Sequence, residues 1–163
     1  MPNNEHEGWR GFRIDEIERK VRKSVQEHSP DIFMINAGSN DCLQCFKIEE
    51  AGKRLGDMLD YLWLACPQST VLLSTLIVNA DEEVNSEVMR FNEQCRVLAE
   101  KLAIEKRKVV LVDMYTSKGP DVRGLVDGVH PGDESYNKMS RLWFRGIREA
   151  MQKGFINESM YRI

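Results

Sequence analysis

The sequence has no apolar run long enough to cross a membrane and no excess of charge of one sign. Its longest apolar stretches, IFMINA and TVLLSTLIV, are far shorter than the ~20 residues that a membrane-spanning helix requires. The chain carries 23 basic and 26 acidic residues, mixed along its length, for a net charge of -3. This mixture provides neither a basic patch for nucleic acid nor an acidic disordered tail. The composition therefore predicts a globular protein with no membrane span and no nucleic-acid partner.

Cysteine is scarce, and the four cysteines do not form a recognisable metal site. Cys42 and Cys45 make one C-x-x-C pair, but no second pair and no histidine at zinc-ligand spacing accompanies them. We expect Cys95 to be a buried thiol, because it lies on the apolar side of a predicted helix. An even number of cysteines permits a disulfide if the protein is secreted, with no pairing indicated. Neither a metal nor an organic cofactor is expected.

The N-terminal segment also lacks the features of a secretory signal peptide. MPNNEHEGWRGF contains neither a basic region nor an apolar one. If Met1 is the true start, the chain is expected to remain in the cytoplasm. The length of 163 residues predicts one domain over residues 1–163, large enough to bury roughly 70% of its unfolded surface.

Three apolar runs predict strands that are buried on both faces, at residues 30–38, 69–78 and 108–114. Four amphipathic stripes predict helices around them, and these stripes begin at Ile14, Leu55, Val84 and Tyr136. Asp133 is a candidate N-cap for the last helix. Strands that alternate with helices of this length indicate βαβ crossovers and a parallel sheet between helical layers. The expected fold is a single α/β sandwich, in which ligands bind beyond the carboxyl ends of the strands.

Polar or glycine-rich segments follow two of the predicted strands and precede the first predicted helix. Asn40 lies in AGSND, which we expect to form a loop after the first strand, and Gly11 lies in HEGWRGFRIDEI, directly ahead of a helix. Asp127 and His130 lie three positions apart in DGVHPGDE, in the loop after the last strand. We expect these segments to meet at one rim of the sheet. There, Asp127 would orient His130, and His130 would carry a proton. Taken singly, each segment would also suit a solvated loop or turn.

Together, the three segments resemble blocks of the SGNH/GDSL hydrolases, and more closely the acetyl-xylan-esterase-like branch, carbohydrate esterase family three. HEGWRGFRIDEI resembles the second block of the family, NAGSND the third and DGVHPGDESYNKM the fourth. The resemblance extends from residue 6 to about residue 150. It implies a three-layer, flavodoxin-like sandwich and a serine esterase that deacetylates sugars or polysaccharide without a cofactor.

The resemblance also implies a role for individual residues. Asp127 would orient His130, which would act as general base toward a serine hydroxyl and then as acid toward the leaving alcohol. The Asn40 side-chain amide and the Gly11 backbone N–H would donate to the oxyanion. Half-buried packing is the favoured role for Trp9, with stacking on a sugar ring as the alternative. The implied substrate is a small ester or an acetylated carbohydrate, and lysophospholipids and thioesters, which other members of the superfamily use, stay open.

The first block of the family, Gly-Asp-Ser with the nucleophile, does not occur in this sequence. No nucleophile is assigned to this chain. Ser39 lies inside the third block, where the resemblance gives a variable residue, and Ser69 and Ser74 belong to a predicted strand. Ser117 and Ser135 follow no strand-to-helix elbow. We therefore expect an N-terminally truncated esterase domain whose first strand, and in many relatives a secretion signal, would lie upstream. The strand at residues 30–38 would then be a bare edge, open to aggregation or to self-association. The alternative is a non-catalytic protein that keeps the rim to bind a sugar or a partner.

Overall fold

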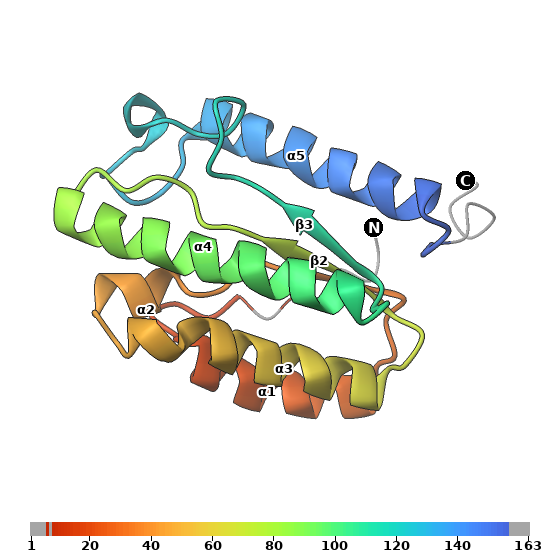
Figure 1. Ribbon diagram of the computed structural model, residues 1–163. Coiled ribbons are helices and arrows are strands. Elements are labelled where there is room, and N and C mark those ends of the chain that lie inside the picture. Colours follow the sequence, from red (N-terminus) through yellow and green to blue (C-terminus); the bar gives the residue numbers. More distant parts are fainter. Residues whose placement is uncertain (1–5, 7, 157–163) are drawn as a thin grey trace.

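The computed structural model describes residues 6 and 8–156, which form a three-stranded parallel sheet with helices on both faces (Figure 1). The strands are β1 (Ile32–Ile35), β2 (Thr70–Ser74) and β3 (Val109–Val112), in the order β1-β2-β3. In the two ladders, Ile32 is opposite Thr70 and Val71 is opposite Val109. The predicted α/β class with a parallel sheet is therefore confirmed.

Amphipathic helices cover the two faces of this sheet. The helices α1 (Ile14–Glu27), α3 (Ala51–Ala65) and α4 (Glu82–Ile104) lie on one face, and α5 (Asp133–Gln152) covers the other (Figure 1). Because successive side chains of a strand point to opposite faces, Leu73 packs in the core of the three helices and Leu72 in the core under α5. None of the helices in the described part of the chain is long and apolar enough to cross a membrane.

Three short elements complete the structure, and one of them corrects the sequence prediction. These elements are α2 (Ser39–Leu43) and two 3-10 turns, η1 (Ile48–Glu50) and η2 (Val122–Gly124). The expected loop after the first strand is in fact helical, because α2 begins directly after Gly38, whose φ of +114° favours glycine. The N-cap of α5 is also corrected: Gly132 takes that position, and Asp133 is the first helical residue.

The strands are shorter than the apolar runs predicted, because side chains replace strand partners beyond the ladders. The Leu76 N–H donates to Asn92 Oδ1 (2.7 Å), and Asn92 Nδ2 donates to the Leu76 carbonyl (3.0 Å). The Met114 N–H donates to Thr75 Oγ1 (2.8 Å). All four residues are buried, so their backbone groups need these partners. Apolar residues past the strand ends are thereby buried without belonging to the sheet.

β1 forms an edge of the described sheet. Among the described residues it pairs only with β2. Met34 is 49% exposed and the other residues of β1 are partly buried, whereas every residue of β2 is buried. The expectation of strands covered on both faces is therefore wrong for β1, while the expected exposed edge is present.

Candidate active site

His130 and Asp127 form a hydrogen-bonded pair in the loop between β3 and α5. His130 Nδ1 lies 2.7 Å from Asp127 Oδ2. Asp127 Oδ1 accepts the backbone N–H groups of His130 (2.7 Å) and Val129 (3.0 Å), so one carboxylate holds both the ring and its backbone. A carboxylate at Nδ1 favours the tautomer that carries its proton there and leaves Nε2 as an acceptor. Nε2 hydrogen-bonds to none of the described residues, so it is available to take a proton from a hydroxyl.

Hydrogen bonds keep Asp127 ionised. The backbone N–H of His130, the imidazole of His130 and the backbone N–H of Val129 together lower the pKa of Asp127 to about 2. The pair is open to solvent, with the side chain of His130 72% exposed and that of Asp127 55% exposed. Because water screens exposed charges, the pair contributes little to stability, and its structural effect is to fix the orientation of the imidazole ring.

Backbone hydrogen bonds hold the loop that carries the pair. The Val126 N–H donates to the His130 carbonyl (2.8 Å) beside a short antiparallel bridge. At the tip of the loop, the Ala80 N–H donates to the Gly128 carbonyl (2.9 Å), which joins the loop to the segment that follows β2. Gly128 has a φ of +83°, and a Cβ there would lie 3.0 Å from the Ala80 Cβ. Glycine therefore permits both the turn and the close approach.

Asn40 lies in the first turn of α2, at the carboxyl end of β1. Its Nδ2 donates to the Phe12 carbonyl (3.0 Å), which fixes the orientation of the amide. One turn later, Gln44 Nε2 donates to the Gly11 carbonyl (3.3 Å). The amides of Asn40 in α2 and of Gln44, the C-cap of α2, thus bind consecutive carbonyls of the segment ahead of α1. We call these four residues, Gly11, Phe12, Asn40 and Gln44, the α1–α2 corner; it holds both predicted oxyanion donors.

Gly11 sits in a turn that leaves its backbone accessible. Its φ is +79°, and the turn is closed by the Phe12 N–H, which donates to the Trp9 carbonyl (3.3 Å). No atom lies within 4 Å of the position that a Cβ would take, and the Gly11 N–H donates to none of the described residues. Trp9 is exposed and stacks on Phe12, with 5.5 Å between the ring centroids. Lys20 Nζ lies 4.1 Å from the centre of the Trp9 ring. Its contact with substrate stays a prediction.

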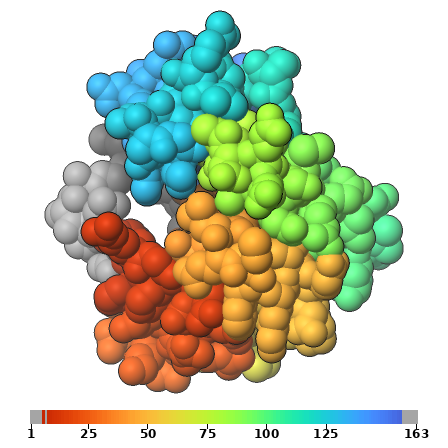
Figure 2. All heavy atoms as spheres, turned by 90° about the vertical axis from the view of Figure 1, so that its left-hand side faces the viewer, coloured from red at the N-terminus to blue at the C-terminus, as the bar shows by residue number. Residues whose placement is uncertain are grey.

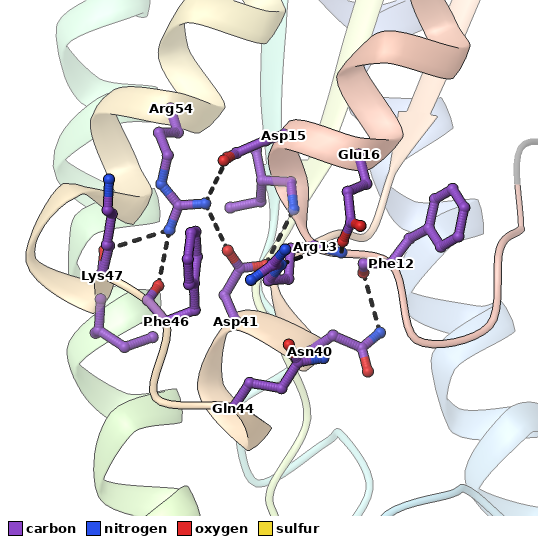
Figure 3. A network of polar contacts seen from close by, with 12 residues as sticks. Phe12, Arg13, Asp15, Glu16, Asn40, Asp41, Gln44, Phe46, Lys47 and Arg54 are labelled. Carbon is purple, nitrogen blue, oxygen red and sulfur yellow. Dashed lines mark hydrogen bonds and ion pairs between the residues drawn. The ribbon is translucent and has the colours of Figure 1, made fainter.

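A buried ion pair lies behind the α1–α2 corner (Figure 3). Asp41 is fully buried; its Oδ2 accepts the Ile14 N–H (3.1 Å) and its Oδ1 accepts Arg54 Nη1 (2.6 Å). Arg54 Nη1 also donates to Asp15 Oδ1 (2.7 Å). The sequence prediction missed Arg54, because nothing in the spacing of α3 distinguishes it from an arginine that faces solvent.

The His130–Asp127 pair and the α1–α2 corner share one face of the molecule. Figure 2 looks onto the face beyond the carboxyl ends of the strands, where residues 8–12 (red), 38–45 (orange) and 125–132 (cyan) border a hollow. The segment that carries the pair and the segments that carry the corner lie on different sides of this hollow, and no hydrogen bond between described residues links the pair to the corner. The four predicted residues therefore border one surface as two separate groups.

No serine hydroxyl in the described part of the chain hydrogen-bonds to the His130 ring. Ser74 and Ser135 are buried and hydrogen-bond to other groups. Ser39 is exposed in the first turn of α2, next to Asn40. The described part of the chain thus places no serine at the His130 ring, and the assignment of none of these serines as nucleophile stays a prediction.

Neither metal ligands nor reactive thiols gather in the described residues. Within this part of the chain, no group of three or more histidine, cysteine, aspartate or glutamate side chains is arranged to hold a metal ion. All four cysteines are free thiols, and Cys95 is buried as predicted. Burial raises the pKa of Cys42 to about 12 and raises that of Cys95 as well. Both thiols stay protonated at neutral pH, which makes them poor nucleophiles.

Known proteins resemble this chain in sequence. The family described as GDSL-like lipase/acylhydrolase matches residues 4–143. A multidomain esterase of Ruminococcus flavefaciens is 26% identical over 128 residues, a match that covers 76% of this chain. The same match covers 16% of the esterase, so this chain spans about a sixth of the length of that curated relative.

Solved structures resemble the chain in fold. A carbohydrate esterase of family 3 from Talaromyces cellulolyticus superposes with a TM-score of 0.80 at 20% identity, covering 91% of this chain and 72% of that one. A family 3 carbohydrate esterase of Clostridium thermocellum gives 0.78 at 20% identity, covering 93% and 73% of the two chains. At this identity the likeness is evidence for the fold alone. The sequence match to the family covers most of the chain, however, and confirms the predicted resemblance: the chain belongs to the GDSL-like lipase/acylhydrolase family.

Proposed function

We propose that this chain carries the general base and the oxyanion donors of an ester hydrolase, and that the substrate is an acetylated sugar or polysaccharide. The observation that carries the proposal is the 2.7 Å contact between His130 and Asp127 on the face that also holds the α1–α2 corner. Membership of the family supports ester-bond chemistry. The fold shared with family 3 carbohydrate esterases supports a carbohydrate ester.

The proposed base works through the nitrogen that Asp127 leaves open. His130 Nε2 takes the proton of a hydroxyl as the hydroxyl oxygen bonds to the ester carbonyl carbon. Asp127, held ionised by its hydrogen bonds, stabilises the imidazolium that forms. His130 then returns the proton to the leaving alcohol when the bond between the carbonyl carbon and the ester oxygen breaks.

The proposed oxyanion donors come from the α1–α2 corner. The Asn40 amide has two N–H groups; the Phe12 carbonyl accepts one, and the other is left for the negative oxygen of the tetrahedral intermediate. The accessible backbone N–H of Gly11 is the second donor. Loss of one such donor typically costs about 3–4 kcal/mol in the barrier, or roughly 10²–10³ in kcat.

The attacking hydroxyl is not assigned to a residue of this chain. No Gly-Asp-Ser occurs in the sequence, and no described serine contacts His130. When one member of a triad is missing, the oxyanion donors and substrate binding still leave roughly 10³–10⁴-fold catalysis over water. We therefore expect this chain to hydrolyse an activated ester slowly, with water in place of the serine hydroxyl and His130 as its base.

Hydrolysis of p-nitrophenyl acetate tests this proposal. The wild-type chain is compared with His130→Ala and with His28→Ala, which removes an exposed histidine at the opposite end of α1. The enzyme-dependent rate should survive unchanged in His28→Ala and should fall in His130→Ala to the part that the oxyanion donors and substrate binding supply. Equal rates in the wild type and His130→Ala would overturn the proposed base.

A second assay tests the substrate class. Acetate release from an acetylated xylo-oligosaccharide is compared with cleavage of a lysophospholipid and of an acetyl thioester at equal concentrations. The proposal expects the carbohydrate ester to react fastest, and it expects Trp9→Ala to raise KM for that substrate alone. A preference for the lysophospholipid or the thioester would replace the proposed substrate class.

One observation favours a second function, a non-catalytic protein that binds acetylated sugars. No described serine hydroxyl hydrogen-bonds to His130, so an ester bound in the hollow would meet no hydroxyl of the described residues that the imidazole activates. Isothermal titration calorimetry with the acetylated xylo-oligosaccharide distinguishes the two functions. Binding without any ester cleavage that depends on His130 would favour the non-catalytic function over the hydrolase.

We also propose that β1 is a site of self-association. Within the described sheet its outer edge has no partner strand, and Met34 is 49% exposed there. An edge strand presents a row of free N–H and C=O groups, which pair readily with a strand from another chain. The expected partner is a second copy of this chain.

A further inference from the structure

Arg54 connects three segments that meet behind the α1–α2 corner (Figure 3). Its Nη1 donates to Asp15 Oδ1 (2.7 Å) in α1 and to Asp41 Oδ1 (2.6 Å) in α2. Its Nη2 donates to the carbonyls of Phe46 (3.0 Å) and Lys47 (3.2 Å), in the loop between α2 and η1. One guanidinium therefore binds four acceptors on three segments.

These contacts bear directly on the placement of the two proposed oxyanion donors. Asp41 follows Asn40 in the chain, and its Oδ2 accepts the N–H of Ile14, three residues after Gly11. The Asp41 carboxylate thus holds the start of α1 against α2, with one oxygen on Ile14 and the other on Arg54. Movement of this carboxylate would shift the start of α1 relative to α2, and with it the spacing between the Gly11 N–H and the Asn40 amide.

We propose that Arg54 is a positioning residue for the oxyanion donors, acting through Asp41 to set the distance between Gly11 and Asn40. The proposal rests on the function proposed above, in which the Gly11 N–H and the Asn40 amide are the oxyanion donors. Arg54 itself lies behind the corner and contacts neither Gly11 nor Asn40.

The geometry explains why this position requires an arginine. The side chain of Arg54 is only 13% exposed, and its carboxylate partner Asp41 is fully buried. The planar fork of a guanidinium reaches carboxylates and carbonyls at once, whereas an ammonium is a point charge without that fixed fork. The Arg54 guanidinium also lies 5.2 Å from the ring centre of Phe46. Lysine in its place would keep a charge near Asp41 but would lose part of this set of contacts.

Two substitutions of Arg54 separate its charge from its geometry. In Arg54→Lys the buried Asp41 keeps a cation, so the fold should persist while the contacts to Phe46 and Lys47 are lost. In Arg54→Met the carboxylate loses its cation altogether. We expect the His130-dependent kcat on p-nitrophenyl acetate to fall roughly tenfold in Arg54→Lys and further in Arg54→Met, because small displacements of catalytic groups reduce rates strongly. KM should stay unchanged in both.

Arg96→Lys is the matched control. Arg96 also pairs with a carboxylate, that of Asp113, through Nε at 3.0 Å and Nη2 at 3.3 Å, and its side chain is 34% exposed. It joins α4 to the end of β3 and contacts no residue of the α1–α2 corner. Positioning predicts that only Arg54→Lys lowers kcat, even where both variants lose the same free energy of unfolding. General stabilisation predicts the same effect on kcat in both variants.

Nuclear magnetic resonance supplies a readout that does not depend on activity. The Gly11 backbone amide and the Asn40 side-chain amide should both shift in the Arg54 variants and remain in place in Arg96→Lys. The positioning role is wrong if these resonances stay fixed when Arg54 is replaced. It is also wrong if the substitutions change KM and leave kcat unchanged. If instead the wild type shows no turnover that depends on His130, the proposed function fails, and the resonances still decide whether Arg54 sets the corner.

Discussion

Replacement of Gly38 by alanine should be one of the most damaging small changes in this protein. Gly38 has a φ of +114°, a conformation that side chains rarely adopt, and it immediately precedes α2. A Cβ at this position would lie 2.5 Å from Cζ of Phe91 and 2.9 Å from both Cε atoms. The ring is fully buried and therefore has no space in which to move aside.

Two separate costs follow from this geometry. The unfavourable φ costs about 1–3 kcal/mol for a residue other than glycine. Overpacking against a buried ring costs a further 1–3 kcal/mol, typically ~2. Gly38→Ala should therefore lower the free energy of unfolding by about 2–6 kcal/mol, a large share of the ~5–15 kcal/mol that a domain of this size usually has. Urea denaturation followed by tryptophan fluorescence measures this change.

Gly154→Ala separates the two costs. Gly154 also has a positive φ, +69°, but no atom lies within 4 Å of the position that its Cβ would take. We expect this control to lose only about 1–2 kcal/mol, from the backbone conformation alone. In a Phe91→Leu background, which removes the ring atoms, Gly38→Ala should also lose only its backbone part. The reasoning is refuted if Gly38→Ala is no more damaging than Gly154→Ala, or if its cost is the same with and without the Phe91 ring.

The remaining predictions concern the dyad and the sheet edge. The Asp127 carboxyl should titrate near pH 2 in a carbon-13 experiment, because hydrogen bonds from His130 and Val129 lower its pKa; its contribution to stability is then present above about pH 3.8 and lost as the pH falls toward 2. A midpoint near the ordinary value of 3.8 would show that these bonds do not form in solution. Asp127→Asn should lower kcat on p-nitrophenyl acetate, because the imidazole loses the carboxylate that orients it. The unfolding midpoint should change little, because the pair is exposed. An unchanged kcat would show that Asp127 does not orient His130 for catalysis. Met34→Lys should shift sedimentation profiles toward the monomer, because a lysine on an edge strand disfavours edge-to-edge pairing; an unchanged distribution would exclude β1 as the contact.

Patterns that repeat along the chain were sufficient to predict the architecture. Apolar runs centred on β1, β2 and β3 predicted three strands, and the stripes that begin at Ile14 and Val84 predicted two of the covering helices. These predictions succeeded because burial imposes a period on many residues at once, so no single position decides the outcome. The pairing of Asp127 with His130 was accessible for a related reason, since both residues lie in one short loop.

Features that depend on single long-range contacts were not accessible in this way. The end of β2 is set by the Asn92 amide, sixteen residues away from Leu76 in the sequence. The helical start of α2 depends on a positive φ at Gly38, next to the ring of Phe91. Arg54 resembles any solvent-facing arginine of an amphipathic helix until the structure places Asp41 beside it. In each case the partner is distant in sequence and carries no local signal.

The central claim is that the imidazole of His130 and the amide of Asn40 act on the same tetrahedral intermediate, from two sides of one hollow. The kcat of p-nitrophenyl acetate hydrolysis in the double variant His130→Ala with Asn40→Ala tests this claim most directly. Asn40→Ala alone should lose roughly 100-fold in kcat, and the double variant should be slower than His130→Ala, because the oxyanion donors supply the rate that remains when the base is absent. A double variant as fast as His130→Ala, or an Asn40→Ala variant with wild-type kcat, would contradict the account.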